Sequence, residues 1–110
     1  MIKEQNGDFT KIEMYNMMKG NDVQRASDLV GTVLEIRGFI VCENISADGN
    51  TSVRLIARTD NGYMGTNSNF LMNDIKEISE LVGSGNPFSV AVKQGRSKAG
   101  RNFLYAEWVQ

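Results

Sequence analysis

The segment KQGRSKAGR, residues 93–101, has residue types that could bind phosphate. Its two glycines are separated by four residues, and Arg101 follows the second one, which is close to the phosphate-loop pattern G-x-x-x-x-G-K-[ST]. That loop works between a strand and a helix, because the N-terminal amides of the helix hold the phosphates. Here Asn102 replaces Ser or Thr, and NFLYAEWV (102–109) alternates like a strand. The sequence therefore argues against a nucleotide-binding loop.

Two interpretations of this segment remain: a basic loop for the phosphates of another molecule, or a solvated turn between two strands. From Lys93 to Ala106 the chain has no acidic residue, and its four cations are Lys93, Arg96, Lys98 and Arg101. Gly, Ser, Lys and Arg are also common at hairpin tips for solubility alone. The segment by itself does not decide between the two.

The composition argues against an enzyme. The 110 residues include no histidine and one cysteine, and the net charge is −1. Without the usual general base and the commonest metal ligands, we expect no catalytic residues, no metal, no cofactor and no small-molecule substrate. Cys42 has no partner for a bridge within the chain, which suits a reducing cytoplasm, and we expect it to be buried. No apolar run predicts a signal peptide or a membrane span, so we expect a cytoplasmic protein, in the host cytoplasm if it is viral.

The hydrophobic pattern predicts a disordered N-terminus at 1–8 and a single domain over 9–110. A short helix is expected over 9–19, capped by Asp8, although the alternation of Ile12 and Met14 also permits a strand. Residues 20–31 read as a connecting loop. Beyond residue 31, apolar and polar residues alternate with a period of two, which is typical of β-strands.

Five strands and one longer helix are predicted next. The strands are expected at 32–43, 51–60, 63–67, 88–94 and 102–109. The helix over 69–82 has Ser68 as its N-cap, and Gly38 predicts a bulge or a sharp coil in the first strand. Five strands with a helix between the third and fourth predict a mainly β protein, a β-barrel of the OB-fold type. A small open sheet packed on one helix is the alternative.

The same alternation assigns side chains to faces. On the first strand, Leu34, Ile36, Ile40 and Cys42 are expected to face the core. The residues expected to point outward on the first three strands are Arg37, Phe39, Arg54, Ile56, Arg58 and Tyr63. On the last strand, Phe103 and Tyr105 point outward if Leu104, Ala106 and Trp108 point inward. Phe70 and Phe88 are expected to pack in the core.

This distribution predicts a surface for single-stranded nucleic acid. In an OB-fold, the face of the second and third strands binds oligonucleotides together with two loops, and residues 93–101 form one of those loops. Cations neutralise the phosphates, and exposed aromatic rings stack on bases with little sequence preference. The expected DNA-binding residues are Arg37, Phe39, Arg54, Arg58, Tyr63, Lys93, Arg96, Lys98, Arg101 and Tyr105.

Four pieces match a known family in order and spacing. They are YNMMKGND (15–22), ASDLVGTVLEI (26–36), DNGYMGTNS (60–68) and VKQGRSKAGRNFLYAEWV (92–109). Over residues 15–109 the chain resembles the small single-stranded-DNA-binding proteins of tailed phages of Gram-positive bacteria, including phages with protein-primed replication. The resemblance implies an OB-type, non-enzymatic protein without a cofactor that coats and protects single strands during phage DNA replication. The family's binding role is carried over only to Lys93, Arg101 and Tyr63, which match basic or aromatic positions of its pattern. The chain lacks the acidic C-terminal tail with which bacterial relatives recruit partners, so we do not expect recruitment through such a tail.

A second hypothesis comes from another class. The near-zero net charge also suits a protein-interaction or structural module of a phage that docks or dimerises through an exposed strand edge and binds no nucleic acid. A homodimer through a strand edge is compatible with both hypotheses. The sequence does not choose an oligomeric state.

Overall fold

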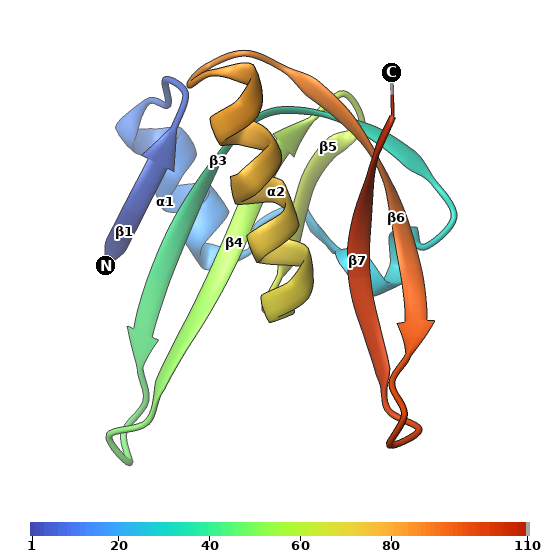
Figure 1. Ribbon diagram of the computed structural model, residues 1–110. Helices are drawn as coiled ribbons and strands as arrows, with labels where there is room; N and C mark the ends of the chain where they lie inside the picture. The colour runs from blue at the N-terminus through green and yellow to red at the C-terminus, as the bar shows by residue number, and fades with distance from the viewer. Residues whose placement is uncertain (110) are drawn as a thin grey trace.

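The chain is a mainly β protein built on one strongly curled sheet (Figure 1). The computed structural model describes residues 1–109. Within them, the elements are β1 (Ile2–Asn6), α1 (Lys11–Lys19), β2 (Val23–Arg25), a 3₁₀ turn (Ala26–Leu29), β3 (Val33–Ile45), β4 (Thr51–Thr59), β5 (Gly62–Thr66), α2 (Asn69–Val82), β6 (Phe88–Arg96) and β7 (Asn102–Val109). The predicted succession of strands and helix appears as β3 to β7 with α2 after β5, and β1 and β2 precede it. None of the helices in this part of the chain has both the length and the apolar character needed to cross a bilayer.

The sheet curls because β3 is shared between its two halves. Residues 33–36 of β3 pair with β6, and residues 36–45 of β3 pair with β4. The sheet order is therefore β2-β5-β4-β3-β6-β7, and β1 pairs with β3 outside this order. In Figure 1 the β3–β4 and β6–β7 hairpins point the same way from the two sides of the half-barrel. Within residues 1–109, no ladder joins β5 or β2 to β7. The barrel-like character is therefore confirmed, and the sheet is open on one side.

Helix α2 spans that open side and completes the main core. Ser68 caps it, as predicted, by accepting the N–H of Leu71 at 3.4 Å, and Leu71, Ile75 and Ile78 form its buried stripe. At the free edge of β7, the hydroxyl of Ser68 donates to the carbonyl of Leu104 at 3.3 Å. Further along that edge, the carboxylate of Asp74 accepts the N–H of Ala106 at 3.0 Å. The side chains of Asp74 in α2 and of its N-cap Ser68 thus bind edge groups of β7 that no neighbouring strand reaches within residues 1–109.

Gly38 produces the predicted bulge, and the bulge changes which residues face the core. The register shifts between Ile36 and Gly38, and Gly38 has a φ of 151°. A bulge adds one residue to a strand, so the side chains after it exchange faces. Phe39 and Val41 consequently lie in the main core beneath α2, while Ile40 and Cys42 face the opposite side. The expectation that Phe39 points outward and stacks on a base is wrong, since it is only 4% exposed.

A second, smaller core lies on the back of the sheet. It contains Met17 of α1 with Ile40, Cys42 and Ile56 of the sheet, and α1 thereby covers β3 and β4 on that side. Ile56, expected outward, is fully buried there. Much of the face that the sequence predicted to be the binding surface, around Ile40, Cys42 and Ile56, is therefore covered by the N-terminal segment.

The N-terminal segment is more ordered than its sequence indicated. Ile2–Asn6, within the stretch expected to be disordered, forms β1 and pairs antiparallel with residues 39–42 of β3. The predicted helix is confirmed as α1, but Thr10 caps it instead of Asp8. In the expected loop at 20–31, β2 pairs in parallel with β5, and the 3₁₀ turn buries Ala26 and Leu29. These differences arise from tertiary pairing, which a local pattern does not contain.

Candidate nucleic-acid interface

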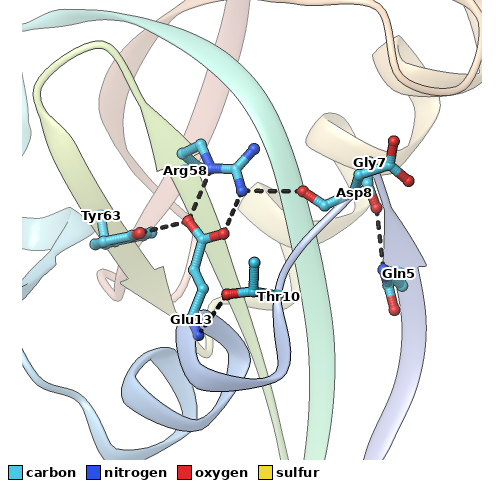
Figure 2. Close-up of polar contacts among 7 residues, drawn as sticks. All are labelled: Gln5, Gly7, Asp8, Thr10, Glu13, Arg58 and Tyr63. Carbon is cyan, nitrogen blue, oxygen red and sulfur yellow. Dashed lines mark hydrogen bonds and ion pairs between the residues drawn. The ribbon is translucent and has the colours of Figure 1, made fainter.

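Arg58 and Tyr63, two of the expected DNA-binding residues, are bound to Glu13 of α1 (Figure 2). The Arg58 Nε donates to the Glu13 carboxylate at 3.0 Å, and its Nη2 donates to the second carboxylate oxygen and, at 3.0 Å, to the carbonyl of Asp8. The hydroxyl of Tyr63 donates to the same carboxylate at 2.5 Å. The Arg58 guanidinium also lies 4.3 Å from the centre of the Phe9 ring. Both side chains therefore hold α1 against the sheet.

The shared contacts change the acidities of all three groups. The hydrogen bonds from Arg58 lower the pKa of Glu13, because they stabilise the ionised carboxylate. The hydrogen bond to Glu13 raises the pKa of Tyr63, because it stabilises the protonated phenol. The same carboxylate raises the pKa of the Arg58 guanidinium. Protonation of Glu13 would weaken the contact between α1 and the sheet.

This arrangement predicts a pH dependence of stability. Glu13 has a lower pKa in the folded chain than in the unfolded chain, so its contribution is fully present above the unfolded pKa and is lost as the pH falls through the folded pKa. Urea unfolding of the wild type and Glu13→Gln is compared at about pH 7 and at about pH 3. The wild type should be more stable than the variant near neutrality, and the difference should shrink in acid. An equal difference in stability between wild type and Glu13→Gln at both pH values would show that the ionised Glu13 carboxylate does not stabilise the fold.

Two further expected residues lie in ion pairs. Arg37 is exposed on β3, and its Nε lies 2.7 Å from the carboxylate of Glu35. Lys93 on β6 lies 3.6 Å from the carboxylate of Glu107 on β7. Surface pairs of this kind are weak and exchange readily with other partners. Lys93 belongs to the same hairpin as the remaining basic residues, whereas Arg37 lies apart from them near the bulge.

The tip of the β6–β7 hairpin carries three cations without an acidic partner among residues 1–109. Arg96, Lys98 and Arg101 are exposed and take part in no ion pair within that range. The turn is closed by the N–H of Ser97, which donates to the carbonyl of Arg101 at 2.8 Å, and Gly100 adopts a φ of 82°. Strand β7 follows directly, so the context of a nucleotide-binding phosphate loop is absent here. The segment is a basic hairpin tip.

Next to this tip lies a row of three aromatic rings. The Phe70 and Phe103 ring centres are 5.1 Å apart, and those of Phe103 and Tyr105 are 5.9 Å apart. Phe70, expected in the core, is 62% exposed, because it lies beside the buried stripe of α2 and not on it. Phe103 covers Gly95, where an added Cβ would lie 2.6 Å from the ring. Trp108, expected inward, is 47% exposed, whereas Leu104 and Ala106 pack against the core as predicted.

Two adjoining hollows extend from this row toward β5. The hollow nearer the hairpin tip measures about 300 Å³ and is lined by Ser27, Ser68, Gln94, Asn102, Phe103 and Leu104. The other measures about 430 Å³, shares Ser27 and Leu104, and includes Arg25 and Arg54. Arg54 of β4 thus lines a hollow that also includes Leu104 of β7. A further hollow of about 740 Å³ beside α1 is lined by Glu13 and Asp22, and these acids do not favour a polyanion.

The structure thus divides the ten expected residues into two groups. Lys93, Arg96, Lys98, Arg101 and Tyr105 share one hairpin, and the hollows connect it with Arg54. Phe39, Arg58, Tyr63 and Arg37 lie outside this region. Sequence reasoning gave Arg25 and Phe70 no place in the site, although the position of Phe70 off the Leu71–Ile75–Ile78 stripe was a usable signal for exposure.

Comparison with protein-family models, curated proteins and solved structures finds no match to this chain. Within residues 1–109, no group of three or more His, Cys, Asp or Glu side chains is placed to hold a metal ion.

Proposed function

We propose that this protein binds single-stranded DNA without sequence preference and thereby coats and protects strands exposed during replication. The observation that carries the proposal is the aromatic row Phe70–Phe103–Tyr105 beside the hairpin-tip cations, which have no acidic partner within residues 1–109. Bases stack on exposed rings, each at about 1–3 kcal/mol, while cations neutralise the backbone. Neither contact reads a base edge, which accounts for the lack of sequence preference.

The proposed path of the strand differs from the one expected from the sequence. Because α1 covers the back of β3 and β4, the strand is placed on the β6–β7 hairpin and along the hollows beside β7. Arg54 then contributes from the wall of a hollow, and Arg58 and Tyr63 contribute indirectly by fixing α1.

The arrangement of β3 to β7 supports an OB-type fold as part of this proposal. A long first strand that pairs with both the second and the fourth, and a helix between the third and the fourth, are features of that fold. The β6–β7 hairpin tip would be its loop between strands four and five, one of the loops that bind oligonucleotides. The additional α1 and β1 explain why a different surface is used here.

The test removes the three tip cations together. The variant Arg96→Ala, Lys98→Ala, Arg101→Ala should bind an oligo(dT) strand more weakly than the wild type in a gel-mobility assay. Since each phosphate contact on a single strand adds about 0.7 to the slope of log K against log salt, the slope should fall by about 2. A control variant without Lys3, Lys11 and Lys76 removes the same charge elsewhere. An equal loss of affinity for oligo(dT) in both variants would show that net charge, and not the hairpin, governs binding.

A further inference from the structure

Arg54 lines the larger of the two adjoining hollows, the one of about 430 Å³. It has no anionic partner there among residues 1–109. Its side chain is partly buried, and within the described chain it forms no ion pair and no side-chain hydrogen bond. Arg25 lines the same hollow, and none of the carboxylates in the described part of the chain does. Two guanidinium groups around one cavity repel each other unless an anion lies between them. Guanidinium groups bind phosphate oxygens in a bidentate manner, so the hollow has the chemistry of a phosphate site.

Gly65 makes room for the Arg54 side chain. A Cβ added at Gly65 would lie 2.6 Å from Nη2 of Arg54 and 2.9 Å from a methyl carbon of Val23. The Arg54 guanidinium thus lies against the backbone of β5, close to Val23 of β2. The polar groups that complete the walls of this hollow are those of Ser27, Thr66 and Asn67.

The adjoining hollow has a different chemistry. Its polar lining is uncharged and consists of the amides of Gln94 and Asn102 and the hydroxyls of Ser27 and Ser68. Phe103, the middle ring of the aromatic row, forms another wall. A nucleobase carries no charge and presents a π-face for stacking, and amide side chains, which both donate and accept, can bond the edge of any base. This hollow therefore suits a base.

We propose that the two hollows together hold one nucleotide of the bound strand, with its phosphate between Arg25 and Arg54 and its base against Phe103. The assignment rests on the proposed function and gives it a defined subsite. Ser27 and Leu104 line both hollows, so the two are next to each other, as the phosphate and the base of one nucleotide are. Volumes of about 430 and 300 Å³ are in the range of small-ligand sites.

The first test maps the site by NMR amide shifts on the wild-type protein. Oligo(dT), the mononucleotide dTMP and inorganic phosphate are added separately. Oligo(dT) should shift the amides of Gly65, Asn67 and Gln94 together with those of the hairpin tip. The mononucleotide should shift the same three amides without the hairpin tip, at a higher concentration than oligo(dT) requires. Inorganic phosphate should shift only the amides of Gly65 and Asn67. If oligo(dT) shifts only the hairpin tip and the aromatic row, the strand bypasses the hollows and the inference is wrong, while the proposed function stands.

The second test uses variants. Arg54→Gln and Gly65→Ala should each weaken binding of oligo(dT) by about 10-fold to about 100-fold, the former by removing a charge-assisted contact and the latter by displacing the guanidinium at constant charge. Lys11→Gln removes one charge on α1 and should leave the affinity unchanged. If the two variants bind as Lys11→Gln does, the phosphate subsite is refuted. Absence of binding by the wild type itself would instead refute the proposed function.

Discussion

Replacing Phe103 with alanine is expected to weaken binding of an oligo(dT) strand by about 5-fold to about 150-fold, equivalent to about 1–3 kcal/mol. Phe103 is the middle ring of the row and contacts both Phe70 and Tyr105. Its loss removes one stacking surface and separates the other two. Because the ring is partly exposed, the fold should be retained, and circular dichroism checks this. Fluorescence anisotropy of a labelled strand measures the affinity.

Tyr15→Ala provides the matched control. Tyr15 is an exposed ring on α1, 60% accessible and remote from the hairpin, so its removal should not change the affinity. Gly95→Ala provides an independent perturbation, because its added Cβ would lie 2.6 Å from the Phe103 ring and displace it without changing the charge. This variant should also bind more weakly. Normal binding by both Phe103→Ala and Gly95→Ala would exclude stacking on this row.

Replacing Gly38 with alanine is expected to have the largest effect on stability. Its φ of 151° is a conformation that residues with a side chain rarely adopt, and the new Cβ would lie 2.9 Å from the carbonyl oxygen of Asn6 and 3.0 Å from the Phe9 ring. Backbone strain of about 1–3 kcal/mol and overpacking of a similar size add to a loss of about 2–6 kcal/mol. Urea unfolding measures this change in the free energy of unfolding.

Gly31→Ala separates the two causes. Gly31 also has a positive φ, 89°, but an added Cβ there would meet no atom of the described residues 1–109 within 4 Å. Its replacement should therefore cost only the backbone contribution of about 1–2 kcal/mol. If Gly38→Ala destabilises the protein no more than Gly31→Ala does, the N-terminal segment does not pack against the bulge as described.

The elements that depend on local pattern could be predicted from the sequence. The i, i+4 stripe of Leu71 and Ile75, with a Ser cap before it, defines α2 almost to the residue. Period-two alternation and the Asp60–Gly62 turn locate β4 and β5. These signals lie within a few residues of the structure they specify.

The assignment of faces could not be predicted, because it depends on one residue. The sequence indicated a bulge at Gly38, but its effect on the alternation of Phe39 and Ile40 requires knowing that exactly one residue is inserted. The cover over the back of the sheet was missed for another reason. β1 pairs with β3 more than thirty residues away along the chain, and nothing in residues 2–6 alone indicates a strand partner.

For the candidate site too, features set by local sequence could be predicted and features set by tertiary packing could not. The basic hairpin tip was predictable, because four cations without an acid occur together in one segment. The hollows combine Arg25, Arg54 and Phe103 from β2, β4 and β7, which only the folded chain brings together. The sequence therefore predicted the chemistry of the surface better than its position.

The most direct test of single-strand binding is an anisotropy titration of labelled oligo(dT) with the wild-type protein at two salt concentrations. We predict saturable binding at micromolar protein that weakens as salt rises, because cations at the hairpin and in the hollows replace counterions on the strand. An unlabelled duplex should compete poorly, since its stacked bases cannot reach the aromatic row. No binding at micromolar protein, or binding that salt does not change, would contradict the account.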